Sequence, residues 1–319
     1  MTTGPHVAVV VLHWGATAMT VRCLESLRDA AWPGRGTVLV VDNTTRLDEE
    51  VAAHARPLEI QILRPPRNLG FAEGCTLGIS AALERGADFL LLLNNDAVVA
   101  PDFLSPLLKA ASQHADAGLV SPQIVHLNRP TEAWYQGGTF SPWTGIPTQG
   151  HRRPAMARDH PPSEVDFATG CAMLIRPAVI HRVGPFDREL FAYCEDLDLS
   201  IRVRRAGFRV LFVPASLVYH DVSDEPHRAA LRIYYSTRNL MEVMRKHAPC
   251  YTWFSFGVNF LARWVGFFVV LALVRGQPRY LTALARGMLD FARRRLGPSD
   301  FESPVPIGVP RSWPNGDDA

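Results

Sequence analysis

The chain has 319 residues, of which 47% are hydrophobic and 20% are charged, and this is the composition of a globular protein rather than of a disordered one. Five widely spaced cysteines without a CxxC pair exclude a zinc ribbon and a disulfide framework, and they indicate reduced thiols in a cytosol. The N-terminus lacks the basic and then apolar pattern of a signal peptide, so a cytoplasmic location is expected.

The net charge of +2 conceals an asymmetry along the chain. Residues 1–225 hold 20 Lys and Arg against 25 Asp and Glu, whereas residues 226–319 hold 13 against 6. Because the basic part also contains the longest apolar segments, this distribution favours contact with an anionic membrane surface. No nucleic-acid-binding motif is present, so no nucleic-acid partner is expected.

The first third of the chain alternates apolar runs with segments of helical spacing. This alternation predicts an α/β fold with a mostly parallel sheet flanked by helices. The predicted strands cover residues 7–12, 37–41, 59–63 and 89–93, and the predicted helices cover residues 16–31 and 71–84, with another that begins at Pro101.

The middle of the chain is less regular. Regularity fades from about residue 120 to residue 165, in a stretch rich in Pro, Gly, Trp and His that is typical of an acceptor-binding or lid region. Beyond it we predict an ordered apolar run at 167–175, helices at 177–183 and 195–206, and two short strands at 209–213 and 217–220.

Three helices are predicted beyond Pro226, over residues 228–247, 251–274 and 278–296. The uninterrupted apolar run in the middle helix, residues 264–274, is shorter than the ~20 residues that a membrane span needs. We therefore predict helices that lie peripherally on the inner face of the membrane. A re-entrant hairpin and a homodimer interface are the alternatives.

The predicted organisation has three parts. A catalytic domain covers residues 1–225, with a nucleotide-sugar half at about 1–120 and an acceptor half at about 121–225. A basic, aromatic helical region covers residues 226–297, and a disordered tail rich in Pro, Gly and Asp covers residues 298–319.

The polar triplet Asn94-Asn95-Asp96 follows the fourth predicted strand. A carboxylate at the carboxyl end of such a strand lies where open α/β sheets bind ligands. Because Mg²⁺ and Mn²⁺ take hard oxygen ligands together with substrate phosphates, Asp96 is a candidate metal ligand. The alternative is a polar turn before the next helix.

Three acids open the helix predicted at 195–206: Glu195, Asp196 and Asp198. One interpretation is a general base that activates a hydroxyl group. The other is that these acids complement the positive end of the helix dipole. Glu195 and Asp198 share one helix face and Asp196 points elsewhere, so one acid can serve the substrate while the others are structural.

Two further residues carry two interpretations each, and a glycine-containing segment is a third candidate. Asp42 ends the second strand, where it can accept a hydrogen bond from a nucleobase or form a turn. His220 ends the last predicted strand, either as a structural residue or as a ligand of Mn²⁺. Residues 68–74 include glycines that let the backbone approach a phosphate or a ribose, although they form neither GxGxxG nor a P-loop.

Taken in order, these clusters resemble the inverting glycosyltransferases of family 2, in particular the bacterial rhamnosyltransferase-like branch. The resemblance spans about residues 6–240. The matching segments are residues 7–15, 40–43, 68–74, 92–96, 169–176, 186–198 and 234–239.

This resemblance implies a GT-A (Rossmann-like) fold, a nucleotide-diphosphate-sugar donor and a divalent metal, Mg²⁺ or Mn²⁺. By the same resemblance Asp196 is the catalytic base, and Asp96 and His220 ligate the metal. Gly170, Cys171 and Glu195 lie on the acceptor side. The residues implied for the nucleotide sugar are Asp42, Asn68, Gly70, Asn94, Asn95 and Arg238.

Three departures from the family pattern concern donor contacts. The first strand ends in His13-Trp14-Gly15, Cys75 stands where an Asn is frequent, and the triplet begins with Asn94 rather than Asp. The branch that the chain resembles indicates dTDP-rhamnose as donor, and the basic, aromatic C-terminal helices indicate a glycan or lipid-linked acceptor.

Two other functions stay open at this point. One is a metal-dependent sugar nucleotidyltransferase, which needs a Gly-rich loop with Lys or Arg after the first strand. The segment His13-Trp14-Gly15-Ala16-Thr17 does not supply such a loop. The other is a catalytically inactive scaffold that binds sugar nucleotides at the membrane surface.

Overall fold

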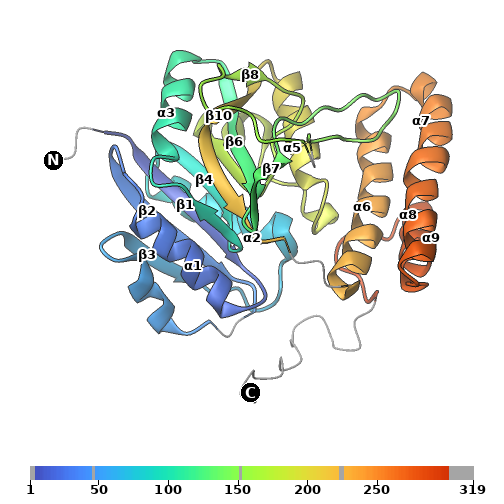
Figure 1. Ribbon diagram of the computed structural model, residues 1–319, viewed down its shortest axis with the longest axis horizontal. Helices are drawn as coiled ribbons and strands as arrows, with labels where there is room; N and C mark the ends of the chain where they lie inside the picture. Colours follow the sequence, from blue (N-terminus) through green and yellow to red (C-terminus); the bar gives the residue numbers. More distant parts are fainter. Residues whose placement is uncertain (1–3, 45–46, 151–152, 223–225, 302–319) are drawn as a thin grey trace.

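The computed structural model describes residues 4–44, 47–150, 153–222 and 226–301. Within this part of the chain a ten-stranded sheet forms the centre of the molecule (Figure 1). Four strands are parallel neighbours, as the sequence predicts: β3 (Glu59–Leu63), β2 (Arg35–Asp42), β1 (His6–His13) and β4 (Phe89–Asn94).

The other half of the sheet is mixed. β9 (Ala172–Ile175) pairs antiparallel with both β4 and β6 (Ala117–His126), and β6 is parallel to β10 (Arg209–His220). The short strands β5 (Ala97–Val99), β7 (Arg129–Tyr135) and β8 (Ser163–Glu164) pair antiparallel with β10, β6 and β10, respectively. The carboxyl ends of β1, β4 and β10 therefore lie along one edge of the sheet.

Helices cover both faces of the sheet because β1 and β4 are apolar on both sides. Alternate residues of β1 contribute to two core layers, with Val9 on one side and Val10 on the other. The layer around Val9 includes α1 (Thr17–Arg28) and α3 (Leu104–Gln113). The layer around Val10 includes α2 (Gly70–Glu84), α4 (Pro177–Val183) and α5 (Glu195–Arg205). Two 3₁₀ turns, η1 (Glu49–Ala55) and η2 (Arg188–Leu190), complete these layers.

Helix α2 lies directly on β1 because two of its residues have no side chain. A Cβ atom on Gly78 would lie 2.3 Å from a methyl carbon of Val10, and one on Gly74 would lie 2.6 Å from Leu12. This close approach brings the N-terminus of α2 to the carboxyl end of β1.

The structure corrects the sequence analysis in the middle of the chain. The irregular stretch expected from residue 120 contains most of β6 and all of β7, and every residue of β6 is buried. The two short strands expected at 209–213 and 217–220 are one strand, β10, which is irregular between Val213 and Leu217.

Helices beyond residue 225 form a layer beside the sheet (Figure 1). They are α6 (Pro226–His247), α7 (Trp253–Asn259), α8 (Gly266–Val274) and α9 (Arg279–Ala292), with a 3₁₀ turn η3 (Cys250–Thr252) before α7 and a π-helical segment η4 (Phe260–Val265) between α7 and α8. Ile233 and Tyr234 of α6 pack with Ala272 and Tyr280 in the core of this layer.

Part of the predicted disordered tail is ordered. Residues 298–301 contact α6, where the Phe301 ring stacks on Tyr234 and the backbone N–H of Ser299 donates to the Tyr235 hydroxyl. An aromatic side chain that buries its ring fixes the end of this segment. The remainder of the predicted tail, residues 302–319, lies outside the described residues.

One helix in the described part of the chain, Cys250–Val274, is long and apolar enough to cross a membrane by length and composition. Only 11% of its most apolar window is buried. Phe254, Leu273 and Val274 are among its most exposed side chains. Trp264 on another face donates a hydrogen bond to Thr237 of α6, so the helix rests against the rest of the protein on one side.

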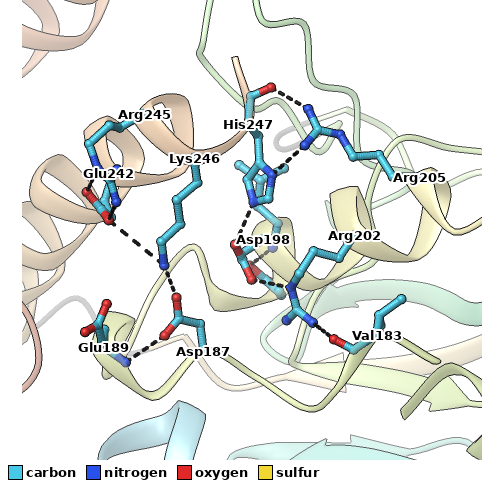
Figure 2. Close-up of polar contacts among 12 residues, drawn as sticks. Val183, Asp187, Glu189, Asp198, Arg202, Arg205, Glu242, Arg245, Lys246 and His247 are labelled. Atoms are coloured by element: carbon cyan, nitrogen blue, oxygen red, sulfur yellow. Dashed lines mark hydrogen bonds and ion pairs between the residues drawn. The ribbon is translucent and has the colours of Figure 1, made fainter. Parts of the chain in front are cut away.

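Polar contacts join the C-terminal end of α6 to the segments around α5 (Figure 2). His247 Nε2 lies 2.7 Å from Asp198 Oδ1, and Arg202 Nε donates to the other carboxylate oxygen over 2.8 Å. Lys246 forms an ion pair with Asp187. Burial raises the pKa of Asp198, but its bonds with His247 and Arg202 lower the pKa by a larger amount. The net pKa therefore lies below the ordinary value.

Candidate active site

A cavity of about 360 Å³ opens at the edge of the sheet where β1, β4 and β10 end. It is lined by Asp96 and His220 from the strand ends and by Glu195 and Asp196 from the start of α5. Residues that lie 124 positions apart in the sequence therefore meet in one pocket. Asp96 and Asp196, the two acids on which the sequence analysis concentrates, share this cavity.

Asp96 and His220 form a pair at the strand ends. The Oδ1 atom of Asp96 lies 3.1 Å from Nε2 of His220, which is buried and whose ring makes a T-shaped contact with the Trp134 ring. Burial lowers the pKa of His220, but the neighbouring Cys171 and Asp96 raise it by more, so the net pKa lies well above its ordinary value.

The Asp96–His220 pair fits a divalent cation. Neighbouring ligands in an octahedral shell at about 2.1 Å lie about 3 Å apart, close to the separation of these two atoms. Within the described residues no group of three or more His, Cys, Asp and Glu side chains is arranged to hold a metal. The protein would therefore supply one carboxylate and one imidazole, and a diphosphate and water would complete the shell.

Asp196 is held in place by backbone donors. Its Oδ2 accepts from the N–H of Gly170 over 3.0 Å, and its Oδ1 accepts from the N–H of Leu197 over 2.8 Å. Burial raises the pKa of Asp196, and the two backbone hydrogen bonds partly oppose that rise. A carboxylate with a raised pKa in a cavity is suited to accept a proton from a substrate hydroxyl.

The three acids of α5 have three different environments. Asp198 is paired with His247 and Arg202, and so has a structural role at the α5–α6 contact. Asp196 is bound by backbone N–H groups. Glu195 lines the cavity next to it, and its Oε2 atom is buried without a hydrogen-bond partner in the described residues.

The segment before α5 has an unusual backbone. Phe191, Tyr193 and Cys194 all have positive φ angles, at 63°, 67° and 66°, a conformation that is costly for residues other than glycine. Asn239 of α6 holds this segment, because its Nδ2 group lies 2.7–2.8 Å from the carbonyl oxygens of Leu190, Ala192 and Tyr193.

The same segment also fixes the start of α2. The carbonyl oxygen of Phe191 accepts hydrogen bonds from the N–H groups of Phe71 and Ala72. Gly70 precedes them with φ at +71°, and a Cβ atom there would lie 2.6 Å from the Phe191 carbonyl oxygen. The strained segment thus joins α2, α5 and α6 around the cavity.

Most of the residues expected to contact the nucleotide sugar line the cavity: Asn68, Gly70, Asn94 and Asn95. Asn68 accepts from the backbone N–H of Gly70, and Asn95 donates to the carbonyl oxygen of Trp14 and to the Thr20 hydroxyl. The residues expected on the acceptor side, Gly170, Cys171 and Glu195, line it as well.

Two residues expected to contact the nucleotide sugar, Asp42 and Arg238, do not line the cavity. Asp42 is fully buried, and it accepts from the backbone N–H groups of Thr44 and Leu47, as in the alternative in which it forms a turn. Arg238 is also fully buried, and it donates to the carbonyl oxygens of Leu190 and Gly297. These bonds already occupy the guanidinium, so the structure does not place Arg238 near a diphosphate.

Arg228 and Arg232 of α6 line the cavity instead, and the sequence analysis did not single them out. The Arg228 guanidinium lies over the Trp14 ring at 5.2 Å, and Trp14 itself lines the cavity. A signal for these residues was present in the sequence. Two arginines four positions apart share a helix face, and this helix follows the strand that ends in His220.

Comparison with known proteins shows the family and the fold of the chain. The profile of a family described as "Glycosyltransferase like family 2" matches residues 5–242. The chain belongs to glycosyltransferase family 2. Solved structures similar to this family 2 chain include *S. aureus* TarS 1–349 with UDP-GlcNAc (TM-score 0.58, 15% identity, 90% of this chain and 82% of that chain). A mannosyltransferase of *Pyrobaculum calidifontis* with GDP-Man and Mn²⁺ has a TM-score of 0.55 at 14% identity, over 92% of this chain and 89% of that chain. The expected GT-A fold is thereby confirmed.

Curated relatives of this family 2 chain include rhamnosyltransferases. An N-acetylglucosaminyl-diphospho-decaprenol L-rhamnosyltransferase of *Mycobacterium tuberculosis* is 27% identical over 208 residues, which cover 58% of this chain and 66% of the relative. The dTDP-rhamnosyl transferase RfbF of *Shigella flexneri* is 24% identical over 225 residues, with 66% and 72% covered. The chain thus spans about two thirds of the length of these relatives, and the likeness to the rhamnosyltransferase branch is confirmed.

Proposed function

We propose that this protein is an inverting glycosyltransferase that moves a sugar from a nucleotide-diphosphate sugar to a hydroxyl group of a glycan or lipid-linked acceptor. The observation that carries the proposal is that Asp96 with His220 and Glu195 with Asp196 line one cavity in a family 2 chain. The first pair suits a cation and its diphosphate, and the second pair suits an alcohol that must lose a proton.

The reaction follows from the position of Asp196. Its carboxylate accepts the proton of the acceptor hydroxyl while that oxygen forms a bond to the anomeric carbon of the donor sugar. The bond between this carbon and the diphosphate oxygen breaks, and its electron pair leaves with the nucleoside diphosphate. Because attack occurs opposite the leaving group, the configuration inverts. A divalent cation, Mn²⁺ or Mg²⁺, held by Asp96 and His220 would supply positive charge near the leaving diphosphate.

Arg228 and Arg232 are our candidates for the remaining diphosphate contacts, in place of Arg238. Both line the cavity from α6, and their guanidinium groups match phosphate oxygens in geometry and charge. Replacement of Arg232 by Ala should weaken binding of a nucleoside diphosphate without abolishing the contribution of the metal. Titration of that variant and of wild type with dTDP and Mn²⁺ measures this effect.

The substrates that we propose are inferred from the names of the relatives. Their names point to dTDP-rhamnose as donor and to a sugar on a polyprenyl diphosphate as acceptor. An acceptor of that kind is carried by a membrane. The exposed apolar face of Cys250–Val274 and the nearby basic residues Arg275 and Arg279 support docking on the anionic inner face of the membrane. A homodimer through the same face is the alternative.

The deciding experiment incubates the purified chain with Mn²⁺, an N-acetylglucosaminyl diphosphate lipid and a panel of nucleotide sugars that includes dTDP-rhamnose. We expect release of nucleoside diphosphate and a new glycosidic bond whose anomeric configuration, read by NMR, is opposite to that of the donor. Release of pyrophosphate from a sugar phosphate and a nucleoside triphosphate would indicate a nucleotidyltransferase. Absence of turnover with every donor, despite donor binding, would indicate a scaffold.

A further inference from the structure

Glu195 is a buried carboxyl group whose position no structural contact explains. It is 5% exposed, it begins α5, and it lines the cavity. Its Oε2 atom has no hydrogen-bond partner in the described residues, and no ion pair with Glu195 is found there. Since nearly all buried polar atoms in proteins are paired, an orphan of this kind at a cavity wall indicates a group kept for a ligand.

The surroundings of Glu195 disfavour a second negative charge. Asp196 follows it directly and is stabilised as a carboxylate by the N–H groups of Gly170 and Leu197. Burial, the charge of Asp196 and the charge of Asp198 raise the pKa of Glu195 well above its ordinary value. Two adjacent carboxyl groups with such different environments divide into one ionised and one neutral member.

The other titratable groups near Glu195 do not change this assignment. They are the Cys75 thiol on α2, the Cys194 thiol and the Tyr193 phenol. Burial raises the pKa of all three, so each is neutral when Asp196 is ionised. From α6 the cavity receives Arg228 and Arg232, which lie within electrostatic range of Tyr193.

We propose that Glu195 acts as a neutral carboxylic acid that donates a hydrogen bond to a sugar oxygen bound beside Asp196. This inference rests on the proposed function and adds a specificity-determining residue to it. The sugar oxygen belongs to the donor or to the acceptor, and the chemistry is the same in both cases. The neighbouring pair then has two tasks, because Asp196 removes a proton while Glu195 orients the sugar that reacts.

The test compares Glu195→Gln, which keeps an uncharged hydrogen-bond donor of similar shape, with Glu195→Ala, which removes the donor. We expect Glu195→Gln to stay within a few-fold of wild type in kcat/KM. Glu195→Ala should lose about 100- to 1,000-fold, the range seen when one preorganised donor is removed. Glu195→Gln should melt at or above the wild-type temperature at neutral pH, because the amide does not ionise and so avoids the cost of keeping a buried carboxyl group protonated.

Two arms identify the source of the oxygen. The first measures binding of dTDP-rhamnose and of dTDP with Mn²⁺ and without acceptor. Loss of the affinity difference between these two ligands in Glu195→Ala assigns the oxygen to the donor sugar. The second arm measures KM for the N-acetylglucosaminyl diphosphate lipid, and a rise there with donor binding unchanged assigns the oxygen to the acceptor.

Several results would overturn the inference. If Glu195→Gln is as inactive as Glu195→Ala, the negative charge is required and Glu195 is not a neutral donor. If Glu195→Ala keeps wild-type kcat/KM and wild-type binding, the side chain contacts no substrate. A lower melting temperature for Glu195→Gln would reveal a structural partner and is measurable without any substrate. Failure of the proposed function is distinct, because wild type itself would then transfer no sugar.

Discussion

The backbone N–H of Gly170 donates a hydrogen bond to the Asp196 carboxylate over 3.0 Å, and this contact joins the segment before β9 to the first turn of α5. A Cβ atom on Gly170 would lie 2.9 Å from the Phe71 ring, so glycine also lets this backbone pass close to α2. The carboxylate is thus oriented by main-chain atoms rather than by a flexible side chain, an arrangement suited to proton transfer.

The first prediction concerns the proposed base. Asp196→Asn should lower kcat by orders of magnitude, because the amide cannot accept the hydroxyl proton but still offers one oxygen to the Gly170 N–H. Donor affinity, measured by calorimetry with Mn²⁺, should stay near the wild-type value. Asp102→Asn changes an exposed acid that pairs with Arg158 and serves as the control. Near-normal turnover in Asp196→Asn would remove this residue from the role of base.

The second prediction separates metal binding from chemistry. Asp96→Ala should abolish the gain in donor affinity that we expect Mn²⁺ to give to wild type, because one of the two proposed protein ligands is lost. Without metal, the two proteins should bind the donor equally weakly. Calorimetric titrations with dTDP-rhamnose measure the donor affinity of wild type and of Asp96→Ala, each with and without Mn²⁺. An undiminished effect of Mn²⁺ in Asp96→Ala would place the cation elsewhere.

The third prediction tests the contact between α6 and the strained segment. Asn239→Ala leaves the carbonyl oxygens of Ala192 and Tyr193 without their side-chain donor, whereas the Leu190 oxygen keeps its bond from Arg238. We expect a loss of about 2–4 kcal/mol in the free energy of unfolding. Turnover should fall further than stability alone explains, since Tyr193 and Glu195 would lose their fixed positions. Asn259→Ala removes one bond within a single helical stretch and is the matched control. Equal effects of the two substitutions in urea unfolding and in kcat would contradict this role.

The fourth prediction concerns pH and Glu195. Burial raises the pKa of this group in the folded protein above its value in the unfolded chain. The folded protein therefore becomes less stable as the pH rises above the pKa of about 4.3 that glutamate has in the unfolded chain. This loss of stability grows until the pH reaches the pKa of the folded state. Glu195→Gln does not titrate, so it should be about 1–3 kcal/mol more stable than wild type at neutral pH and no more stable near pH 4. Melting curves from pH 4 to pH 8 measure the difference in stability between Glu195→Gln and wild type. A difference that does not change with pH would argue against a raised pKa for Glu195.

The fifth prediction addresses the exposed helix. Phe254 is 85% exposed, and Phe267 and Leu273 are also exposed. Replacement of these three residues by Ser should lower binding to vesicles that contain phosphatidylglycerol by orders of magnitude, since each side chain contributes about 1.5–3 kcal/mol when buried in lipid. Cosedimentation measures the binding, and vesicles of phosphatidylcholine alone are the control for charge. A change from dimer to monomer with vesicle binding unaffected would assign the face to a second copy.

The fold was predictable where single segments carry their own signal. Strands β1 and β4 are uninterrupted apolar runs, and α2 is bounded by Gly70 and Gly86. Strand β6 carries no such signal, because Ser121, Pro122 and Gln123 interrupt its apolar pattern. Its polar side chains are buried only because distant partners satisfy them, since Ser121 bonds the Tyr135 hydroxyl and Gln123 donates to the Met156 carbonyl oxygen.

The meeting of the candidate residues in one cavity was predictable at strand ends and at the start of a helix, where topology brings side chains together. Asp96, Asp196 and His220 belong to this class. Arg238 does not, because an arginine in an amphipathic helix is expected to reach solvent or a ligand. Its actual partners are carbonyl oxygens of Leu190 and Gly297, which are supplied by segments 48 and 59 positions away. Contacts of that kind depend on tertiary packing, and the local sequence pattern does not predict them.

Opposite sides of α6 face two different surroundings. Arg228, Arg232 and Tyr235 line the cavity, whereas Ala230, Ile233 and Tyr234 pack toward α8 and α9. Packed helix axes lie about 8–10 Å apart, so the docking of α7 and α8 on a bilayer that we propose would place the reaction centre within roughly 20 Å of the lipid. A sugar on a lipid diphosphate would then be elongated while its hydrocarbon chain stays in the leaflet. The thickness of the helical layer would set the distance between the reaction centre and the membrane surface.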